Sequence, residues 1–449
     1  MGNCIHIIFK INDELNKIMQ STDCFSIEYL NKMKDVFFFT NLISILQSYV
    51  ESRGTVYQIC EVYLLRVENL YYKLDFNWLV SLKDQLSGEI SIDTTTITQN
   101  NVSDENLVNT LCQYLFKYGK ERVPLRAALC QVYHHAIHDR WHRAKHLFLM
   151  SRIQEGIQHN DISTHILYNR VLVQLGLCAF RHGYFREALN ALRDIQLTGR
   201  SKELLAQGLI MKNTERSLKQ ELLERRQLLP FHMHINLELV ECVYLVSILA
   251  LEGAYSIAPT QEQRNKFNSR GFVYLTRNIE KLAIHGPPET MREYVYAAFK
   301  SLCVGDWKTC ISHIKSMKCW KLLVHSDSVL SILTKKLKQE CLAAYIFANC
   351  RAYSKITFSY LLDKFQLSEG EIKSTINRLI IYDHFPAKWN QETTVLTIFQ
   401  DMLPNNSHFL ISAILDRLDN LNDQQQRSVD IMNIVNSTKE KYFSKSKAN

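Results

Sequence analysis

Glycine and proline are scarce in this sequence, with 14 and 7 residues among 449. A protein built from many strands needs more of the turn chemistry that these two residues provide. The scarcity therefore favours a helical protein. Because 46% of the residues are hydrophobic and 22% are charged, the chain can bury a large core. At this length we expect either a few domains or one long helical solenoid.

Long apolar runs are absent as well. No run reaches the ~18 residues of a membrane span, and the nearest, Val36 to Val50, is interrupted by five polar residues. The opening MGNCIHIIFK has too short an apolar run for a signal peptide, and His6 stands where a myristoylation signal needs serine or threonine. We therefore expect a soluble, cytoplasmic protein with no membrane partner.

The short motifs of common enzymes are also missing. The sequence contains no G-x-x-x-x-G-K-[ST], G-x-G-x-x-G, H-E-x-x-H or G-x-S-x-G. Its 12 cysteines form no C-x-x-C pair, and most stand among apolar neighbours, as expected of reduced core residues. We expect a protein that is not an enzyme and that holds no cofactor.

Four histidines, His134, His138, His142 and His146, recur at the spacing of one helical face. Two histidines at this spacing can bind a metal ion when they share a helix. A turn is expected at Asp139 and Arg140, however, which assigns the histidines to two different helices. No cysteine or carboxylate accompanies them to complete a ligand set. We therefore expect no metal site here.

Three segments share one spacing. Each has an apolar residue or glycine, a turn residue seven positions later, an aromatic residue just after the turn, a small residue one helical turn on, and a further apolar residue. The residues that carry it are Val132, Asp139, Trp141, Ala144 and Phe148; Gly176, Gly183, Phe185, Ala188 and Leu192; and Ala298, Gly305, Trp307, Cys310 and Ile314. This spacing is typical of tetratricopeptide-like helical hairpins. The separations are irregular, so we predict an irregular solenoid with further hairpins between Gln196 and Met291. Three coincidental hairpins in an ordinary helical domain are the alternative.

The pattern changes after Lys338. A helix from Glu340 to Arg351 is followed by a short helix, FSYLLDKF, which Thr357 can cap. The helix SEGEIKSTINRLIIYD comes next, with a capping box at Ser368 and Glu371. The segment Phe385 to Trp389 and the strand-like VLTIF at Val395 to Phe399 then form a small hairpin that completes a winged helix.

Winged helices often bind DNA, which makes the charge of the second helix informative. It carries Glu369 and Glu371 against Lys373 and Arg378. A phosphate-binding face needs a larger excess of positive charge. We therefore favour docking to protein, with the exposed strand edge as one docking surface.

An apolar stripe follows Pro404. We predict that Leu410, Ile414, Leu418 and Leu421 form one face of a helix that joins a bundle with partner proteins, whereas packing against the chain's own winged helix is the alternative. The chain ends in a basic segment whose lysines are candidate contacts to RNA phosphates, although a solvated terminus is the simpler interpretation. These lysines are Lys439, Lys441, Lys445 and Lys447.

These patterns divide the chain into four parts. Residues 1–110 form an N-terminal helical region with a polar linker near 86–105, and residues 111–338 form the helical repeats. Residues 339–402 form the winged helix, and residues 403–449 form an amphipathic helix with the basic tail. The expected fold is all-α, a tetratricopeptide-like solenoid followed by a winged helix and a C-terminal helical segment.

Helical repeats that lead into a winged helix resemble the PCI scaffold proteins of the proteasome lid, the COP9 signalosome and eukaryotic translation initiation factor 3. Longer strings resemble one family among them, the C subunit of initiation factor 3, from roughly Val36 to Phe399. The strings are ILYNRVLVQLGLCAFRHG, TGRSKELLAQG, LPFHMHINLELVECVYLVSILALE and GPPETMREYVYAAFKSLCVGDWKTC. The sequence departs from this family in having only some 35 residues before the match, where the family has a long charged region.

The resemblance implies a scaffold subunit that supports assembly on the small (40S) ribosomal subunit and recruitment of messenger RNA and initiator transfer RNA. The implied partners are other PCI and MPN subunits, especially the other large PCI subunit (a), and contact with messenger or ribosomal RNA is left open. Two alternatives remain: a PCI scaffold of the proteasome lid or COP9 signalosome, and a winged-helix protein that binds nucleic acid by itself.

Overall fold

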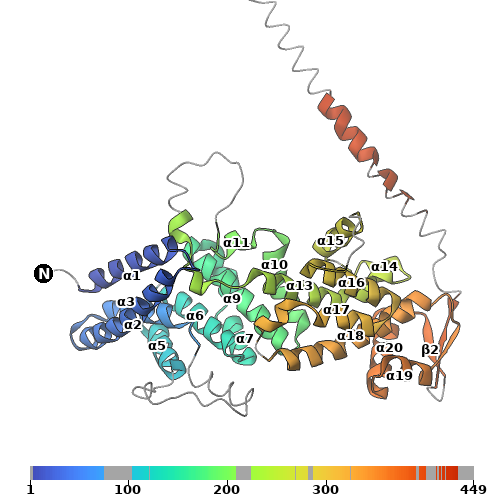
Figure 1. The fold of residues 1–449 in the computed structure, drawn as a ribbon, viewed down its shortest axis with the longest axis horizontal. Helices are drawn as coiled ribbons and strands as arrows, with labels where there is room; N and C mark the ends of the chain where they lie inside the picture. The colour runs from blue at the N-terminus through green and yellow to red at the C-terminus, as the bar shows by residue number, and fades with distance from the viewer. Residues whose placement is uncertain are drawn as a thin grey trace, which may run out of the picture. The chain divides into compact units, whose positions relative to one another are not determined.

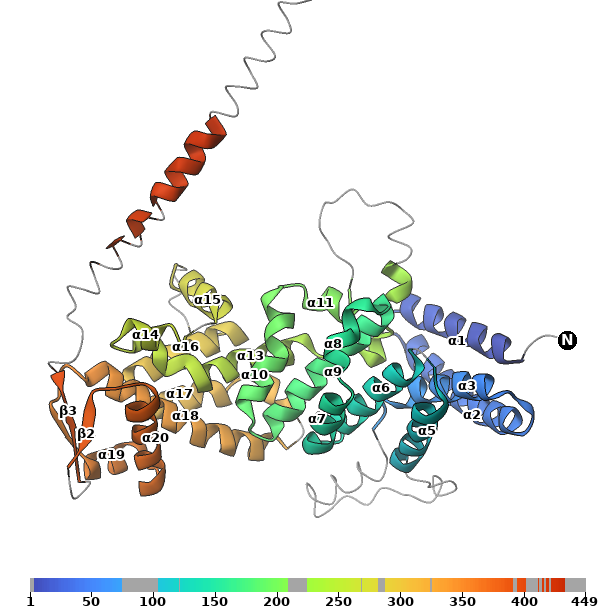
Figure 2. The ribbon, with the colours of Figure 1, turned by 180° about the vertical axis from the view of Figure 1, so that it is seen from behind.

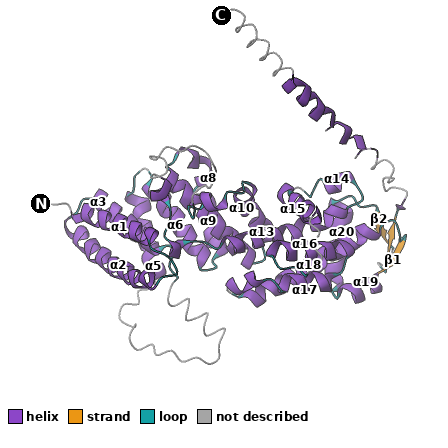
Figure 3. Ribbon diagram, turned by 45° about the horizontal axis from the view of Figure 1, so that its top comes forward, coloured by secondary structure: helices purple, strands orange, loops and turns teal. Residues whose placement is uncertain are grey.

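The computed structural model contains two compact units. It describes residues 4–74, 104–120, 122–208, 224–267, 269–281, 287–323, 325–390 and 394–400, together with residues 411, 414–415, 417–419 and 421–432. Unit 1 comprises Met1–Leu251, Ser269–Ala298 and Ile311–Lys336, and unit 2 comprises Glu252–Asn268, Phe299–Cys310 and Leu337–Asn449. Helices dominate the described residues, and the strands form one small sheet (Figure 3). The prediction of a helical fold with a winged helix is confirmed.

Unit 1 contains most of the helices. They are α1 (Cys4–Ser21), α2 (Ile27–Arg53), α3 (Val56–Leu70), α5 (Asp104–Tyr118), α6 (Val123–Ile137), α7 (Trp141–Met150), α8 (Ile153–Gly156), α9 (Ile162–Arg181), α10 (Phe185–Leu197), α11 (Ser201–Leu204), α13 (Leu237–Glu252, whose last residue belongs to unit 2) and α15 (Arg270–Lys281), with the 3-10 turns η1 (Ile157–His159), η2 (Phe231–Met233) and η4 (Lys318–Leu322). Helix α3 packs against α2 and α5, α6 packs against α5, α7 and α9, and α9 packs against α10 (Figure 1).

Helices α2 and α3 begin at capped positions and share a core with α1. The Ser26 side chain accepts a hydrogen bond from the Tyr29 amide at the start of α2, and Thr55 and Gln58 form a capping box at the start of α3. Such caps bind amides that the first turn of a helix leaves without a partner. Buried residues of α1, α2 and α3 meet in one cluster, which contains Ile5, Ile8, Phe39, Ile43, Leu46, Val50, Val62 and Leu65.

The hairpin turns have the backbone conformation that their sequence favours. Asp139, Gly183 and Gly305, which share one position in the predicted spacing, have φ values of 56°, 81° and 81°. At Gly183 a Cβ atom would lie 2.8 Å from Cγ2 of Ile332, so glycine is required both for its backbone freedom and for space. As predicted, the turn at Asp139 separates the histidine series, with His134 on α6 and His142 on α7.

Unit 2 contains the winged helix. Its elements are η3 (Gly253–Ile257), α14 (Gln261–Arg264), β1 (Lys355–Thr357), α19 (Phe358–Phe365), α20 (Glu369–Tyr382), β2 (Ala387–Trp389) and β3 (Val395–Ile398). The sheet order is β1-β3-β2 with both pairs antiparallel, and Figure 2 shows β2 beside β3. Ile356 pairs with Leu396, and Lys388 pairs with Thr397. The capping box of Ser368 and Glu371 forms as predicted.

Besides α13, three described helices contribute residues to both units: α16 (Met291–Val304), α17 (Trp307–Lys315) and α18 (Ser326–Asn349). The prediction that the last of them begins at Glu340 was wrong, because α18 begins at Ser326. Val329, Leu333 and Leu337 recur every four residues and are each 1% exposed, so the apolar face of the helix extends well before Glu340.

Two further differences concern short segments. Strand β1, which is not among the elements predicted from the sequence, precedes α19, and Thr357 occupies the N-cap position of α19 without a side-chain hydrogen bond. The predicted linker near 86–105 lies outside the described residues except at its end, where α5 begins. Within the described residues, no helix is both long and apolar enough to cross a bilayer.

Candidate partner-binding surfaces

The residues of the repeated spacing lie inside the helix pairs rather than on an exposed surface. Trp141 and Ala144 of α7 are buried, as are Phe185 and Ala188 of α10 and Cys310 of α17. Their burial means that they support the surfaces around them and do not contact a partner directly.

Two further residues of the spacing have particular roles. Gly176 is buried at a close contact between helices, and Trp307 makes a hydrogen bond. A Cβ atom on Gly176 would lie 2.8 Å from Cγ of Leu192, so the glycine lets α9 approach α10 closely. Trp307 remains half-buried, and its indole Nε1 donates a hydrogen bond to the Lys364 carbonyl oxygen at 2.8 Å.

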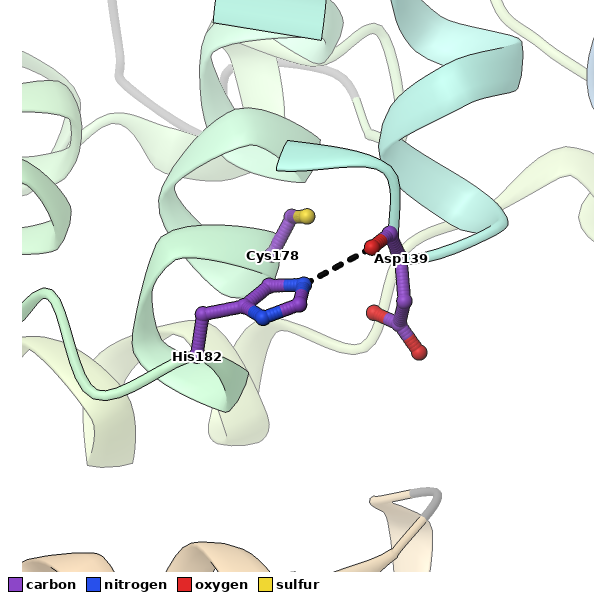
Figure 4. Close-up of side chains that lie close together, drawn as sticks. All are labelled: Asp139, Cys178 and His182. Carbon is purple, nitrogen blue, oxygen red and sulfur yellow. Dashed lines mark hydrogen bonds between the residues drawn. The ribbon is translucent and has the colours of Figure 1, made fainter. Parts of the chain in front are cut away.

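The turns of two successive hairpins in unit 1 are bonded to each other. Nε2 of His182, which follows α9, donates a hydrogen bond to the backbone oxygen of Asp139, which follows α6, at 2.7 Å (Figure 4). Arg181 forms an ion pair with the Asp139 carboxylate and also donates to the Ala136 carbonyl oxygen at 2.9 Å. These bonds fix the position of the α9–α10 hairpin relative to the α6–α7 hairpin.

The same turns bring three ligand-type side chains together. Atoms of Asp139, Cys178 and His182 lie within 4.8 Å of one another, and sequence reasoning missed this trio because its members come from two hairpins. Their chemistry does not suit a metal ion: burial raises the pKa of the Cys178 thiol to about 12, and the Asp139 carboxylate is paired with Arg181. We assign the trio a structural role in joining the hairpins.

The winged helix is anchored within unit 2 through buried acidic groups. The Asp383 side chain, which is 2% exposed, accepts hydrogen bonds from Lys266 at 2.5 Å and from the Tyr255 hydroxyl at 3.1 Å. Gln263 donates to the Asp383 backbone oxygen at 2.6 Å. Burial and the neighbouring Asp383 carboxylate raise the pKa of the Tyr255 hydroxyl, which keeps it protonated as a donor.

The cations that a DNA-reading helix would use are already bound within the chain. Arg378 of α20 forms an ion pair with Glu340, whose side chain is 1% exposed, at 3.0 Å. Lys373 lies 3.9 Å from Glu369 and over the ring of Phe358. Arg378 is therefore engaged by a buried carboxylate, and Lys373 has an acidic neighbour one turn away, which agrees with the preference for protein docking at the winged helix.

The sheet of the winged helix offers two strand edges. Within the described residues, β1 and β2 each pair only with the central strand β3, so the outer edge of each carries backbone groups without a strand partner. Trp389 of β2 packs edge-on against Phe358 and donates a hydrogen bond to Asn377 at 2.9 Å. An open strand edge can accept a further strand from another chain.

A basic and aromatic surface surrounds Trp307 in unit 2. We name it the Trp307 surface and define it as Trp307, Lys308, Lys338, Tyr360 and Lys364. Lys338 Nζ lies 4.1 Å from the centroid of the Trp307 ring, and Lys364 Nζ lies 5.7 Å from that of Tyr360, which is exposed. Cations and aromatic rings in alternation are the groups that bind single-stranded nucleic acid.

An apolar face of α2 is exposed in unit 1. We name it the α2 face and define it as Ile27, Leu30, Phe37, Phe38 and Ile45; each of these side chains is at least 65% exposed. Sequence reasoning did not single out this face, because α2 is apolar around much of its circumference. Contiguous exposed apolar surface is characteristic of protein interaction sites.

The C-terminal stripe is only partly described. Ile414, Leu418 and Leu421 are helical and exposed, at 56%, 49% and 58%, whereas Leu410 lies outside the described residues. The exposure leaves these side chains accessible to a partner, and their role in a bundle stays a prediction. The predicted RNA contacts Lys439, Lys441, Lys445 and Lys447 also lie outside the described residues.

Two family models match this chain. Residues 1–261 match the model of the eukaryotic translation initiation factor 3 subunit 8 N-terminus, and residues 313–400 match the PCI domain. The second match covers the winged helix, and the first covers the hairpins from α1 to α13.

Curated relatives support the same assignment. Proteins named as the C subunit of eukaryotic translation initiation factor 3 are 40% identical over 437 residues in Xenopus tropicalis, 37% over 432 residues in Culex quinquefasciatus and 35% over 439 residues in Caenorhabditis elegans. These matches cover 96%, 95% and 96% of this chain but only 47%, 46% and 46% of the relatives, so the chain spans about half of their length. The strings that resembled this family, the hairpins and the winged helix agree: the chain belongs to the family of eukaryotic translation initiation factor 3 subunit 8 and contains its PCI domain.

Proposed function

We propose that this chain is a scaffold subunit of the eukaryotic translation initiation factor 3 complex that supports assembly on the small ribosomal subunit and recruitment of messenger RNA and initiator transfer RNA in the cytoplasm. The observation that carries the proposal is the match to relatives named as the C subunit over 96% of the chain, across both the hairpins and the PCI domain. This name favours initiation factor 3 over the proteasome lid and the COP9 signalosome. None of the relatives' names describes an enzyme.

The partners that we propose are other PCI and MPN subunits, especially the other large PCI subunit. Two features of the chain support docking to such proteins. The outer edges of β1 and β2 can pair with a strand, and Ile414 and Leu418 expose apolar surface on a helix. A helix with one apolar face gains stability by burying that face in a groove or bundle.

A test of this proposal removes the apolar stripe. The stripe variant carries Leu410→Asp, Ile414→Asp and Leu418→Asp. The control variant carries Gln424→Asp, Gln425→Asp and Gln426→Asp, which add the same charge. Wild type and both variants are sedimented through a sucrose gradient from a cell lysate and compared. We expect wild type and control to sediment with the small ribosomal subunit and other PCI subunits, and the stripe variant to sediment apart from them. Copurification with proteasomal subunits, or sedimentation of the wild type as a free chain, would refute the scaffold proposal. Intact assembly of the stripe variant would refute only the placement of the bundle helix.

We further propose that the Trp307 surface contributes an RNA contact. Lys338 is held over the Trp307 ring and also donates to the Gln366 carbonyl oxygen at 3.4 Å, so its position is defined before RNA binds. A binding assay with a labelled single-stranded RNA tests this contact. Lys338→Glu with Lys364→Glu should weaken binding and reduce its dependence on salt, whereas Lys10→Glu with Lys202→Glu should leave both unchanged. Unaltered RNA affinity in the first variant would refute the contact.

A further inference from the structure

A second basic surface lies in unit 1, where the two bonded hairpin turns form a shallow groove of about 520 Å³. We name it the hairpin-tip groove. Its lining residues are Asp139, Arg140, Trp141, His142, Arg143 and His182. It is separate from the strand edges and the C-terminal stripe, and the proposed scaffold function does not use it.

The walls of the groove are held in place by contacts between the two hairpins. Besides the hydrogen bond from His182 to Asp139, Trp141 stacks on Tyr184 with ring centroids 6.0 Å apart and an interplanar angle of 27°. Lys145 of α7 forms an ion pair with Glu187 of α10 at 2.8 Å. The groove therefore has a defined shape before any ligand binds, which lowers the entropic cost of binding.

The groove and its surroundings are strongly basic. Segments 139–146 and 181–187 contain five arginines and lysines against the two carboxylates Asp139 and Glu187, which leaves a net charge of +3 without counting histidines. Both carboxylates are bound within the hairpins, Asp139 by Arg181 and Glu187 by Lys145. The first turn of α7 contains no acidic residue, so the positive end of its helix dipole adds to the same potential.

We propose that the hairpin-tip groove binds an acidic segment of a partner protein. Arg140 and Arg143 line the groove, and a guanidinium group binds a carboxylate through parallel, charge-assisted hydrogen bonds. Successive aspartate or glutamate side chains on one peptide match a basic groove of this size. A basic groove also attracts such a segment from a distance, which raises the association rate at low salt.

The aromatic residues favour an acidic peptide over RNA. Single-stranded RNA needs ring faces on which its bases can stack and a basic track several nucleotides long. The Trp141 side chain is 6% exposed because Tyr184 stacks on it and Lys145 lies 5.5 Å from its ring centroid. Its ring therefore offers no face to a base, in contrast to the exposed Tyr360 of the Trp307 surface.

Fluorescence anisotropy with two labelled probes of equal length tests this inference on the purified full chain. The probes are an octaglutamate peptide and an oligouridylate of eight nucleotides. Arg140→Glu with Arg143→Glu reverses charge inside the groove. Arg143→Glu with Arg186→Glu is a second groove variant, which reverses charge at one lining residue and at one neighbouring residue of α10, both exposed. It serves in case the first variant fails to fold, which its thermal unfolding would show. Lys10→Glu with Lys202→Glu is the matched control at exposed lysines elsewhere in unit 1.

We expect octaglutamate to bind the wild type in a salt-sensitive manner, and a folded groove variant to lose about tenfold or more in affinity. The control should stay within about twofold of wild type. Unchanged octaglutamate affinity in both groove variants would overturn the assignment. Tighter binding of the oligouridylate, lost in the same variants, would overturn it in favour of a nucleic-acid ligand. Because the assay uses the chain alone, its outcome is independent of assembly with other subunits.

Discussion

Lys266 Nζ lies 2.5 Å from Oδ1 of Asp383, and the Asp383 side chain is 2% exposed whereas that of Lys266 is 43% exposed. This pair fixes the end of α20 to the segment that follows α14. Removing the lysine leaves a buried carboxylate without its cation, which is more costly than losing a pair on the surface. The stability of unit 2 should therefore depend on the pair.

The first prediction concerns this pair. Lys266→Met should lower the free energy of unfolding by about 2–4 kcal/mol, because the Asp383 carboxyl group stays buried without its lysine partner. Asp363→Asn, at an exposed position of α19, should change it by less than about 0.5 kcal/mol. Urea denaturation followed by circular dichroism measures both. Equal effects of the two substitutions would show that the buried carboxylate is compensated by other groups.

A second prediction concerns the close approach of α9 and α10. Gly176→Ala places a Cβ atom 2.8 Å from Leu192 and should cost about 1–3 kcal/mol, because a packed core must shift to admit it. Gly156→Ala is the matched substitution, since a Cβ atom there meets nothing within 4 Å. Thermal unfolding compares the two variants. A melting temperature for Gly176→Ala equal to that of Gly156→Ala would mean that the helices can separate at little cost.

A third prediction concerns pH. Burial, with the nearby His138 and His135, lowers the pKa of His134 to about 3, and burial lowers the pKa of His232 to about 4. In the unfolded chain both histidines bind a proton near pH 6.5. The folded protein should therefore be fully stable above pH 6.5 and lose stability as the pH falls toward 4, because the unfolded state gains protons that the folded state does not.

Urea denaturation at several pH values measures this effect. We expect the free energy of unfolding to fall between pH 7 and pH 5 by an amount on the order of 1–2 kcal/mol for His134 alone. His134→Gln should reduce the slope over this range, whereas the same change at the exposed His146 should not. A pH slope unaltered by His134→Gln would show that other groups carry the dependence.

A fourth prediction separates the α2 face from the core of the same helix. Phe38→Lys with Ile45→Lys should leave the unfolding free energy nearly unchanged, because both side chains are already exposed, at 67% and 72%. Ile43→Ala should cost about 2–5 kcal/mol, because Ile43 is fully buried in the cluster of α1, α2 and α3.

The double lysine variant should also self-associate less, as analytical ultracentrifugation would show, because exposed apolar surface promotes association. A large loss of stability in that variant would mean that the α2 face packs against the chain itself.

Local patterns predicted much of the fold. The turn at Gly183, the capping box at Ser368 and the burial of Ala188 each depend on residues close in the sequence, so the sequence alone could indicate them. Strand β1 was missed because it has three residues and forms only by pairing with β3, which follows it by some 40 residues.

The surfaces were harder to predict for a related reason. Two of the contacts described above join residues that are distant in the chain, Asp383 with Lys266 and His182 with Asp139. A local sequence pattern cannot predict such contacts. The α2 face is exposed because other helices pack against the opposite side of α2. A sequence that is apolar on several sides of one helix does not contain that information.

The chain passes five times between unit 1 and unit 2, at residues 251, 268, 298, 310 and 336. No single cut can therefore release either unit with all its residues. A protease that cleaves at one exposed site between residues 252 and 336 should leave two fragments that stay associated until denaturant is added, because each fragment carries residues that the other fragment's unit needs. For the same reason, the winged helix cannot be transferred to another protein together with its whole unit as one continuous segment. Parts of unit 2, residues 252–268 and 299–310, precede later segments of unit 1 in the sequence.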